Sequence, residues 1–249
     1  MVNKYRYKIV FSYDGSLFFG YAKQIDKRTI QGEIEKVLST IFCSNITIYA
    51  SGRTDKGVHA YAQVADFVLD KKIINIDKTL FSINKLLPGD IYVKELRKVN
   101  NNFSSRFNAK SKEYEYIINY KNYDPLKRNY ELFDNKIINI DNIKSMSKLF
   151  IGTHNFKNFT SKEEDEFNFV RTIFDINIKN YKDGHLKLTF IGDGFMRYEI
   201  RKIVGTLIEC GKNRLSENDI LYYLNNEKRI IINYTAIPNG LYLKKVRYK

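Results

Sequence analysis

Hydrophobic and polar positions alternate with a period of two in the first structured segment of the chain, residues 4–13. One face of this segment carries only aromatic and aliphatic side chains, namely Tyr5, Tyr7, Ile9, Phe11 and Tyr13. The opposite face is mostly polar and basic. The alternation predicts a half-buried strand, and the turn-forming pair Asp14-Gly15 predicts its end.

The spacing of apolar residues then alternates between helical and strand-like periods through the first hundred residues. Thr29 is placed to cap a helix whose apolar residues recur every three or four positions, and Pro88-Gly89 is placed to end a second helix. The predicted elements are a helix at 30–42, strands at 46–50 and 58–69, a helix from Asp77 or Thr79 to Leu87, and a strand at 90–99. Together with the first strand they give the order βαββαβ, which is ferredoxin-like.

The second half repeats this order with insertions, after a polar segment at 100–111. Asp183-Gly184 between two alternating runs indicates a hairpin, and Asp141 and Gly152 are placed to begin and end a helix. The predicted elements are a strand at 112–120, a loop at 121–140, a helix at 141–151, strands at 171–179 and 185–191, helices at 195–210 and 216–226, and a strand at 241–248.

These elements predict an α+β protein built from two ferredoxin-like (βαββαβ) halves. The N-terminal half is residues 1–104 and the C-terminal half is residues 105–249. We expect the two halves to join edge to edge into one extended, mostly antiparallel sheet with helices on one side. A cleft along the junction would present residues from both halves.

The charge of the 249-residue chain indicates the kind of partner. Lys and Arg number 42 and Asp and Glu number 28, so the formal net charge is +14. Such a charge favours nucleic acid or an anionic membrane surface. Basic residues interleaved with 19 Tyr and 17 Phe suit RNA, whose exposed bases stack on aromatic rings, although most of these rings belong to the core. We therefore expect an RNA-binding cleft between the halves.

Cysteine usage and apolar runs indicate the compartment. Cys43 and Cys210 lack CxxC spacing and form no disulfide framework, which suggests a reducing environment. The sequence contains neither a signal-peptide pattern nor an 18-residue apolar span for a membrane helix. We therefore expect a cytoplasmic protein without a membrane partner.

The most concentrated set of reactive side chains lies between the second and third predicted strands. Arg53, Asp55 and Lys56 stand in a turn bracketed by Gly52 and Gly57, whose backbone is free to adopt φ > 0. A guanidinium beside a carboxylate favours the ionised form, which suits nucleophilic or electrostatic work. The same residues also fit a hairpin turn that is merely polar, since Gly and Asp are common in turns.

Other catalytic chemistries lack their sequence patterns. His59, His154 and His185 are far apart in sequence, and neither cysteine is near a histidine, so we expect no metal site. The sequence contains no GxSxG elbow, P-loop or GxGxxG, so we expect neither a catalytic triad nor a nucleotide cofactor. A carboxylate with cationic neighbours remains as the candidate.

Arg201 and Tyr114 are the next candidates. Arg201 stands at the edge of the apolar stripe of the helix predicted at 195–210, with Arg197 one turn before it. A half-buried Arg needs a carboxylate partner, but a surface Arg whose stem packs on the helix fits the pattern as well. Tyr114 lies on the strand predicted at 112–120, where a cross-strand core aromatic also fits.

At these residues the chain resembles the tRNA pseudouridine synthase A (TruA) family. Residues 51–60, Ser-Gly-Arg-Thr-Asp-Lys-Gly-Val-His-Ala, are similar to that family's catalytic motif G-R-T-D-x-G-V-H-A. Further matches follow in order at Tyr13–Gly15, Thr29–Glu35, Phe103–Phe107, Lys112–Tyr116, Gly152–Phe156, Arg171–Ile173, Gly194–Met196, Ile200–Leu207 and Gly240–Leu243. The resemblance covers essentially the whole chain.

The resemblance implies an isomerase that converts uridine to pseudouridine at positions 38, 39 and 40 of the tRNA anticodon stem-loop. It implies a homodimer that needs neither a metal nor an organic cofactor. Asp55 is implied to be the nucleophile, with Arg201 as its partner, and Arg53 to help extrude the uridine and fill its place. Tyr114 is implied to stack on the flipped uracil and to act as base for the C5 proton, and Leu241 to line the base pocket. The segment implied to contact RNA is Phe103, Ser104, Ser105, Arg106 and Phe107.

The chemistry agrees with this assignment. A base cannot turn within a duplex stack, so it must be flipped into a pocket. An apolar pocket would exclude the water that a glycosidase activates with two carboxylates. One carboxylate can add to the base or deprotonate the sugar, and the sequence leaves both routes open.

A non-catalytic RNA-binding protein with ferredoxin-like folds is the alternative interpretation. Such modules carry an aromatic signature on one strand, which we do not find in the sequence. Binding alone also has no need of Asp55 with Arg53 and Arg201. Two departures from the family pattern, Tyr21 in place of Trp and Asn155 in place of Asp, lie outside the proposed catalytic set and concern local packing or tRNA contacts.

Overall fold

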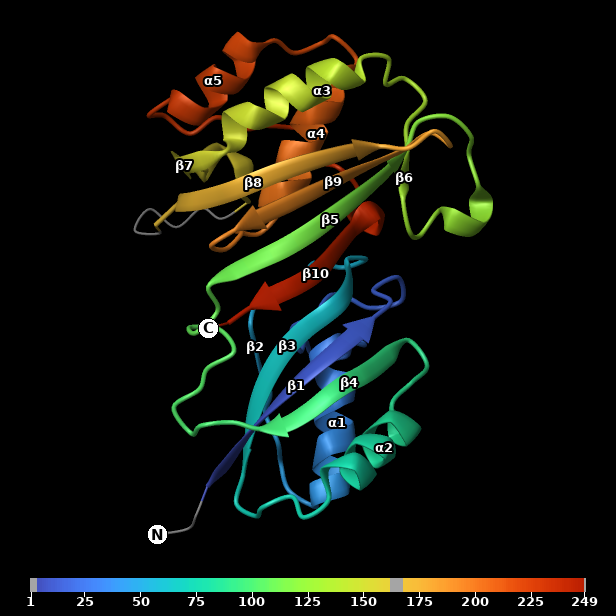
Figure 1. Ribbon diagram of the computed structural model, residues 1–249, viewed down its shortest axis with the longest axis vertical. Coiled ribbons are helices and arrows are strands. Elements are labelled where there is room, and N and C mark those ends of the chain that lie inside the picture. The colour runs from blue at the N-terminus through green and yellow to red at the C-terminus, as the bar shows by residue number, and fades with distance from the viewer. Residues whose placement is uncertain (1–3, 162–167, 249) are drawn as a thin grey trace. The chain divides into compact units, whose positions relative to one another are not determined.

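The computed structural model describes residues 4–161 and 168–248 and has the predicted α+β class with mostly antiparallel strands (Figure 1). Contacts divide the chain into two compact units. We call Met1–Lys110 with Tyr242–Lys249 unit 1, and Ser111–Leu241 unit 2. The last strand thus belongs with the first unit, since strands pair by position in space and not by order along the chain. Each unit is described by itself.

The elements of unit 1 follow the order βαββαβ, with one added strand. In chain order they are β1 (Tyr5–Tyr13), α1 (Ile30–Phe42), β2 (Tyr49–Ala50), β3 (His59–Leu69), α2 (Ile76–Leu86), β4 (Ile91–Lys98) and β10 (Leu241–Arg247). β1 pairs antiparallel with β3 on one side and with β4 on the other. β2 and β10 share the free edge of β3, with β2 antiparallel near Ala65 and β10 parallel near His59.

The core of unit 1 is formed by one face of β1 and the apolar stripe of α1. Thr29 caps α1 as predicted, because its hydroxyl accepts a hydrogen bond from the Gly32 N–H at 3.2 Å. Fully burying each large apolar side chain contributes roughly 1.5–3 kcal/mol. The buried side chains of these two elements include Tyr7, Ile9, Phe11, Tyr13, Ile30, Ile34 and Leu38. The predicted burial of this face of β1 is confirmed from Tyr7 to Tyr13, whereas Tyr5 is only partly buried.

Unit 2 combines four antiparallel strands with a helical layer. Its longer elements are β5 (Ser111–Asn119), α3 (Ile140–Ser147), β7 (Gly152–Asn155), β8 (Val170–Asn180), β9 (His185–Gly192), α4 (Glu199–Gly211) and α5 (Glu217–Asn225). The strand order is β5-β9-β8-β7, and the two-residue strand β6 (Leu132–Phe133) runs parallel to β5. The predicted β8–β9 hairpin is confirmed, and Gly184 in its turn has φ 95°.

α4 begins four residues later than predicted, at Glu199 instead of residue 195. Tyr198 has φ 66°, a left-handed conformation that a right-handed helix does not contain. The Glu199 carboxylate accepts a hydrogen bond from the Met196 N–H at 2.8 Å and closes this turn. Arg197 therefore lies before the helix, and the prediction that it stands one helical turn before Arg201 is wrong.

Two other helix starts differ from the prediction because asparagines cap them. Asn75 caps α2, which begins at Ile76 instead of at Asp77 or Thr79. Asn139 caps α3, which begins at Ile140 and ends at Ser147, and a short 3-10 turn follows it. β7 was not predicted, and neither was β6 within the segment expected to be a loop at 121–140.

Two general expectations can be compared with the structure. Cys43, which is exposed, and Cys210, which is buried, are both free thiols. None of the helices within the described ranges is both long enough and apolar enough to cross a membrane.

Candidate active site

The segment that carries Asp55 connects β2 to β3 and contains a tight turn. The Val58 N–H donates a hydrogen bond to the Asp55 carbonyl oxygen at 3.2 Å. Gly57 stands at the third position of this turn with φ 80°, a conformation that disfavours residues with a side chain. The expected left-handed backbone is confirmed at Gly57, whereas Gly52 is not among the residues with positive φ. Asp55 is partly exposed at the first position of the turn.

Buried hydrogen bonds fix the start of this segment to β3. The Ser51 N–H donates to the Val64 carbonyl at 2.8 Å, and the Ser51 hydroxyl donates to Gln63 Oε1 at 2.8 Å. Gln63 Nε2 in turn donates to the Gly52 carbonyl at 3.0 Å. Gln63 is a buried polar residue within an apolar strand, and the sequence reasoning missed its role. A buried amide that uses both its donor and its acceptor holds the backbone in one arrangement.

The residue next to Asp55 is fixed by β1. Thr54 Oγ1 and the Tyr13 hydroxyl are hydrogen-bonded at 2.8 Å. Burial raises the pKa of Tyr13 to about 12, and the hydrogen bonds to Thr54 and Gln63 offset only part of this shift. The phenol therefore stays protonated near neutral pH. The turn is thus hydrogen-bonded to β1 through Tyr13 and to β3 through Gln63.

A second segment, residues 14–21, packs its backbone directly against the turn. The Tyr21 N–H donates to the Thr54 carbonyl at 3.0 Å. A Cβ placed on Gly15 would lie 2.0 Å from the Val58 carbonyl oxygen, and one on Gly20 would lie 3.1 Å from the Thr54 carbonyl oxygen. Only glycine permits such close approach of two backbones.

His59 connects this packing to the last strand. The Gly15 N–H donates to His59 Nδ1 at 3.1 Å, and the imidazole stacks on the Tyr242 ring at 4.7 Å between centroids. The buried His59 is thus a structural residue at the start of β3. Tyr21, which replaces the usual Trp, is also buried, and its ring stacks on Phe11 at 6.5 Å. Its departure from the family pattern is therefore one of core packing.

Tyr114 and Arg201 lie in unit 2. Tyr114 on β5 is 7% exposed, pairs with Phe190 on β9, and meets the Phe195 ring edge to face at 5.4 Å. Arg201, in the first turn of α4, is half-buried; its Nε donates to the Ala236 carbonyl at 2.7 Å, and its guanidinium lies 4.7 Å from the Tyr198 ring centroid. These contacts orient the guanidinium.

The segment implied to contact RNA divides into a buried anchor and two exposed side chains. Ser105 is 0% exposed, its N–H donates to Asp66 Oδ1 at 2.7 Å, and its carbonyl accepts from the Tyr248 hydroxyl at 2.7 Å. Phe107 is 80% exposed, and the Arg106 guanidinium lies 5.4 Å from its ring centroid. Arg106 and Phe107 are therefore the members of this segment that are free to meet a ligand, while Ser105 fixes the backbone.

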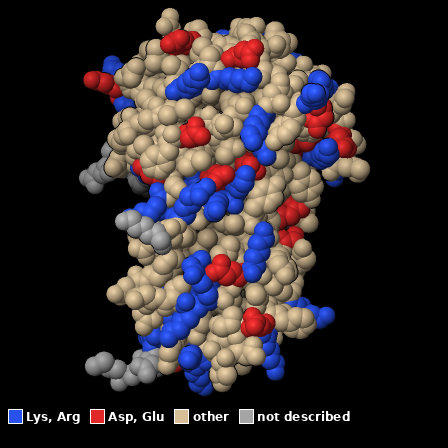
Figure 2. Space-filling view, viewed as in Figure 1, with Lys and Arg blue, Asp and Glu red and all other residues tan. Residues whose placement is uncertain are grey.

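Charge on the visible face of unit 1 is mainly positive. On the side of unit 1 that shows its strands, Lys and Arg side chains form a band interrupted at few points by Asp and Glu (Figure 2). A polyanion is attracted to such a surface. No three His, Cys, Asp or Glu side chains gather into a possible metal site within residues 4–161 and 168–248.

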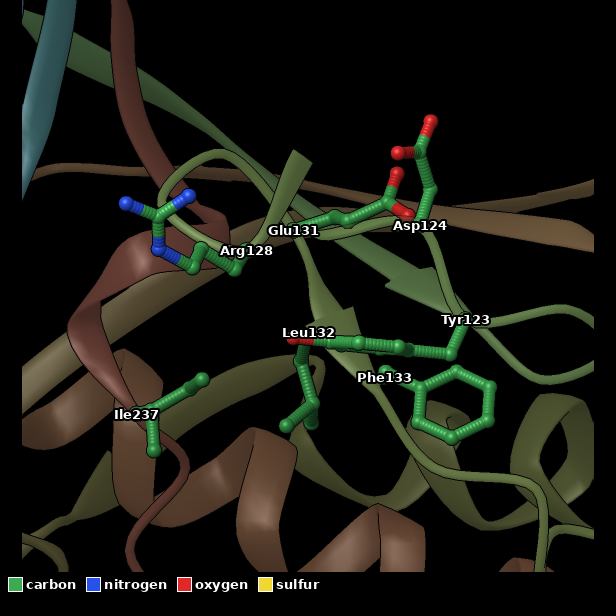
Figure 3. Close-up of a pocket in the computed structure, with 7 residues that line it drawn as sticks. All are labelled: Tyr123, Asp124, Arg128, Glu131, Leu132, Phe133 and Ile237. Atoms are coloured by element: carbon green, nitrogen blue, oxygen red, sulfur yellow. The ribbon is translucent and has the colours of Figure 1, made fainter. Parts of the chain in front are cut away.

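A cavity of about 230 Å³ opens in unit 2, and none of the predicted site residues lines it (Figure 3). Its lining combines two aromatic rings, two aliphatic side chains and three charged residues. These residues are Tyr123, Asp124, Arg128, Glu131, Leu132, Phe133 and Ile237. Glu131 accepts one hydrogen bond from Asn119 and pairs with His185 at 2.9 Å, so both of its carboxylate oxygens have partners.

The structure brings Arg53 and Asp55 together on one turn of unit 1. It places Tyr114 and Arg201 in unit 2, whereas Leu241 is the last residue of unit 2 and the first residue of β10, whose other residues belong to unit 1. The sequence reasoning found these residues but missed Tyr13 and Gln63, which hold the turn. In the sequence, the signal for Gln63 is a polar residue at a position of a strand that the alternating pattern predicts to be buried.

Comparison with known proteins gives one consistent result. The sequence pattern of the family described as tRNA pseudouridine synthase matches residues 9–108 and 146–249. A Streptococcus uberis protein named tRNA pseudouridine synthase A is 38% identical over 247 residues, covering 98% of each chain. Proteins of the same name from Ureaplasma parvum (39% identical; 97% of this chain, 99% of that one) and Thermosipho melanesiensis (38% identical; 98% and 99%) are similarly close. With its full-length similarity and its motif on a fixed turn, the chain belongs to the tRNA pseudouridine synthase family.

Proposed function

We propose that this tRNA-modifying isomerase converts uridine to pseudouridine at positions 38, 39 and 40 of the anticodon stem-loop, with Asp55 as its catalytic carboxylate. The observation that carries the proposal is the fixed turn at Asp55. The neighbours of Asp55 in sequence are held by buried hydrogen bonds, while Asp55 itself remains partly exposed. A catalytic group held on a rigid element keeps its geometry when the substrate arrives.

The reaction moves one bond and leaves the atom count unchanged. The bond from the ribose C1′ to N1 of uracil breaks, the base turns, and a bond forms from C1′ to C5. The proton on C5 is removed and N1 gains one, so no oxidant, reductant or water is consumed. A single carboxylate serves this reaction either by adding to the base or by removing a proton from the sugar.

The other residues are assigned to steps around Asp55. Arg53, exposed on the same turn, helps to extrude the uridine and fills its place in the helix. Tyr114 stacks on the flipped uracil and accepts the C5 proton, and Leu241 lines the pocket, from which water is excluded. Arg201 pairs with Asp55 and keeps it ionised. Support for Arg201 comes from its two orienting contacts, to Ala236 and Tyr198.

The architecture proposed around this site follows the sequence expectation. Two ferredoxin-like halves share one sheet, and the cleft between them receives the anticodon stem-loop. Arg106 and Phe107 contact the RNA outside the pocket, with Phe107 as a stacking platform. The enzyme acts as a homodimer in the cytoplasm, where its tRNA substrates are.

Mapping pseudouridines in tRNA tests the proposal. Unmodified tRNAs with uridine at 38, 39 or 40 are incubated with the protein and then analysed by carbodiimide labelling and primer extension. We expect new stops at these positions only. A matched tRNA in which the three positions are cytidine is the control. Modification at other uridines would overturn the assignment of the substrate site while leaving the reaction class intact.

A further inference from the structure

Two lysine side chains converge on one exposed aromatic ring beside the Asp55 turn. Lys56 Nζ lies 4.4 Å and Lys27 Nζ 4.9 Å from the centroid of the Phe19 ring. Because both distances end at the same centroid, the two ammonium groups are no more than about 9 Å apart. Attraction of each cation to the ring offsets part of their mutual repulsion.

Neither ammonium group has a carboxylate partner among the described residues, unlike other cations of the same segment. Arg28 forms a two-point ion pair with Asp90 at 2.7 and 2.8 Å, and Lys23 pairs with Glu35 at 3.4 Å. Lys27 and Lys56 are both exposed. Two unneutralised cations held close together favour the binding of an anion between them.

The position of this pair relative to Asp55 is fixed by the backbone. Lys56 directly follows Asp55 in the turn. The Phe19 N–H donates to the Arg28 carbonyl at 2.9 Å, which ties the two ends of the 19–28 segment together. Gly20, with φ 93°, packs against the backbone of Thr54 and Lys56. These contacts fix the backbone positions of Phe19 and both lysines beside the turn.

We propose that Lys27, Lys56 and Phe19 form a phosphate clamp that binds the tRNA backbone next to the uridine presented to Asp55. Flipping a nucleotide rotates it about its backbone and leaves its flanking phosphates at the mouth of the pocket. A lysine suits such a phosphate because it acts as a movable point charge. The clamp rests on the proposed function, since it assumes that the target nucleotide lies at Asp55. Its contribution is affinity for the tRNA.

Steady-state kinetics at several salt concentrations test the clamp. The variants are Lys27→Ala, Lys56→Ala and their double, each with tRNA as substrate. We expect KM for tRNA to rise roughly two- to fivefold for each lysine removed, and the slope of log affinity against log salt to fall by about one for each lost phosphate contact. The rate at saturating tRNA is retained. Phe19→Leu keeps an apolar side chain but removes the ring that gathers the cations, so it shows a smaller rise in KM.

Lys78→Ala is the matched control. Lys78 is likewise exposed and has no carboxylate partner among the described residues. It stands in the first turn of α2, whereas Asp90, the ion-pair partner of Arg28, follows the opposite end of that helix. It should match the wild type in KM, salt slope and thermal unfolding.

Three outcomes separate the possibilities. An unchanged KM and salt slope in the double lysine variant overturns the clamp, whatever the role of Asp55. A wild-type rate in Asp55→Asn overturns the proposed function instead. An altered sedimentation coefficient with unchanged KM would show that the lysines face a protein partner, which also overturns the clamp.

Discussion

At the scale of single residues, two carboxylates of this protein occupy opposite environments. Asp55 is partly exposed on a turn, and Ser51, Gly52 and Thr54 before it are hydrogen-bonded to β1 and β3. Glu199 is 0% exposed at the start of α4; one oxygen accepts from the Met196 N–H, and the other has no hydrogen-bond partner within residues 4–161 and 168–248. An accessible acid can contact a substrate, whereas a buried one affects the stability of the protein.

Replacing Asp55 by Asn tests the catalytic assignment. The amide has nearly the same shape but cannot act as a nucleophile or a base, so we expect pseudouridine formation to stop. Binding of tRNA should remain close to wild type, because Asp55 contributes no positive charge to it. The two measurements are tritium release from C5-labelled tRNA and a filter-binding titration. An Asn variant with wild-type turnover would show that another group carries the reaction.

Glu199 makes the stability of the protein depend on pH. Burial raises the pKa of Glu199 from its ordinary value of 4.5 to about 8, and the Met196 N–H and the charge of Arg171 offset only part of this, while Asp193 adds to it. The folded state therefore holds a proton that the unfolded state releases above about pH 5. Between that pH and 8, the free energy of unfolding falls as pH rises, by at most about 1.4 kcal/mol per unit.

The variant Glu199→Gln replaces the titrating carboxyl group by an amide, which does not ionise. Urea unfolding at pH 5, 6, 7 and 8 should show similar stability for both proteins at pH 5 and an increasing advantage of the variant toward pH 8. Glu217→Gln, at an exposed position in the first turn of α5, is the control and should keep the wild-type pH dependence. Parallel curves for wild type and Glu199→Gln would mean that Glu199 is already ionised in the folded state.

At the scale of elements, the site depends on how closely two loops approach each other. Segment 14–21 covers the Asp55 turn through backbone contacts at Gly15 and Gly20. A hydrogen bond between Tyr13 and Thr54 and one from Gln63 to Gly52 fix the turn to β1 and β3. Neither loop has regular secondary structure, so their order comes from one another and from the strands beneath.

The variant Gly15→Ala tests this packing. Its new methyl group would lie 2.0 Å from the Val58 carbonyl oxygen, so one of the two segments must move. We expect a loss of stability of about 1–3 kcal/mol, typical of overpacking, and a loss of activity because the turn carrying Asp55 shifts. Gly89→Ala is the matched control, because its methyl group would meet nothing within 4 Å. Equal unfolding midpoints for the two variants in thermal melts would contradict the tight approach.

At the scale of the whole molecule, the net charge of +14 has a measurable consequence. Binding of a protein to RNA phosphates releases counterions, so log affinity falls linearly with log salt. Contact with six to ten phosphates would lower the affinity for tRNA by about 10³–10⁵-fold between 50 and 200 mM salt. Titrations at four salt concentrations measure the slope. A slope near zero would show that the charge does not contribute to tRNA binding.

The sequence by itself determined the elements and the chemistry that follow from local patterns. Alternation in β1, the Thr29 cap of α1 and the β8–β9 hairpin depend on neighbouring residues, and the structure confirms them. Helix starts were less well predicted where a side chain or a left-handed residue nearby decided them, as at Asn75 and Tyr198.

Only the tertiary structure decided which residues hold the site. Tyr13 reaches the Asp55 turn from β1, 41 positions before Thr54, whereas Gln63 reaches it from β3, the strand that follows the turn; no local pattern encodes these hydrogen bonds. The pairing of β10 with β3 likewise joins Tyr242 to His59 across most of the chain. Contacts of this kind depend on chain closure in three dimensions, so the motif supplied the reactive residue and the fold supplied the groups that keep it in place.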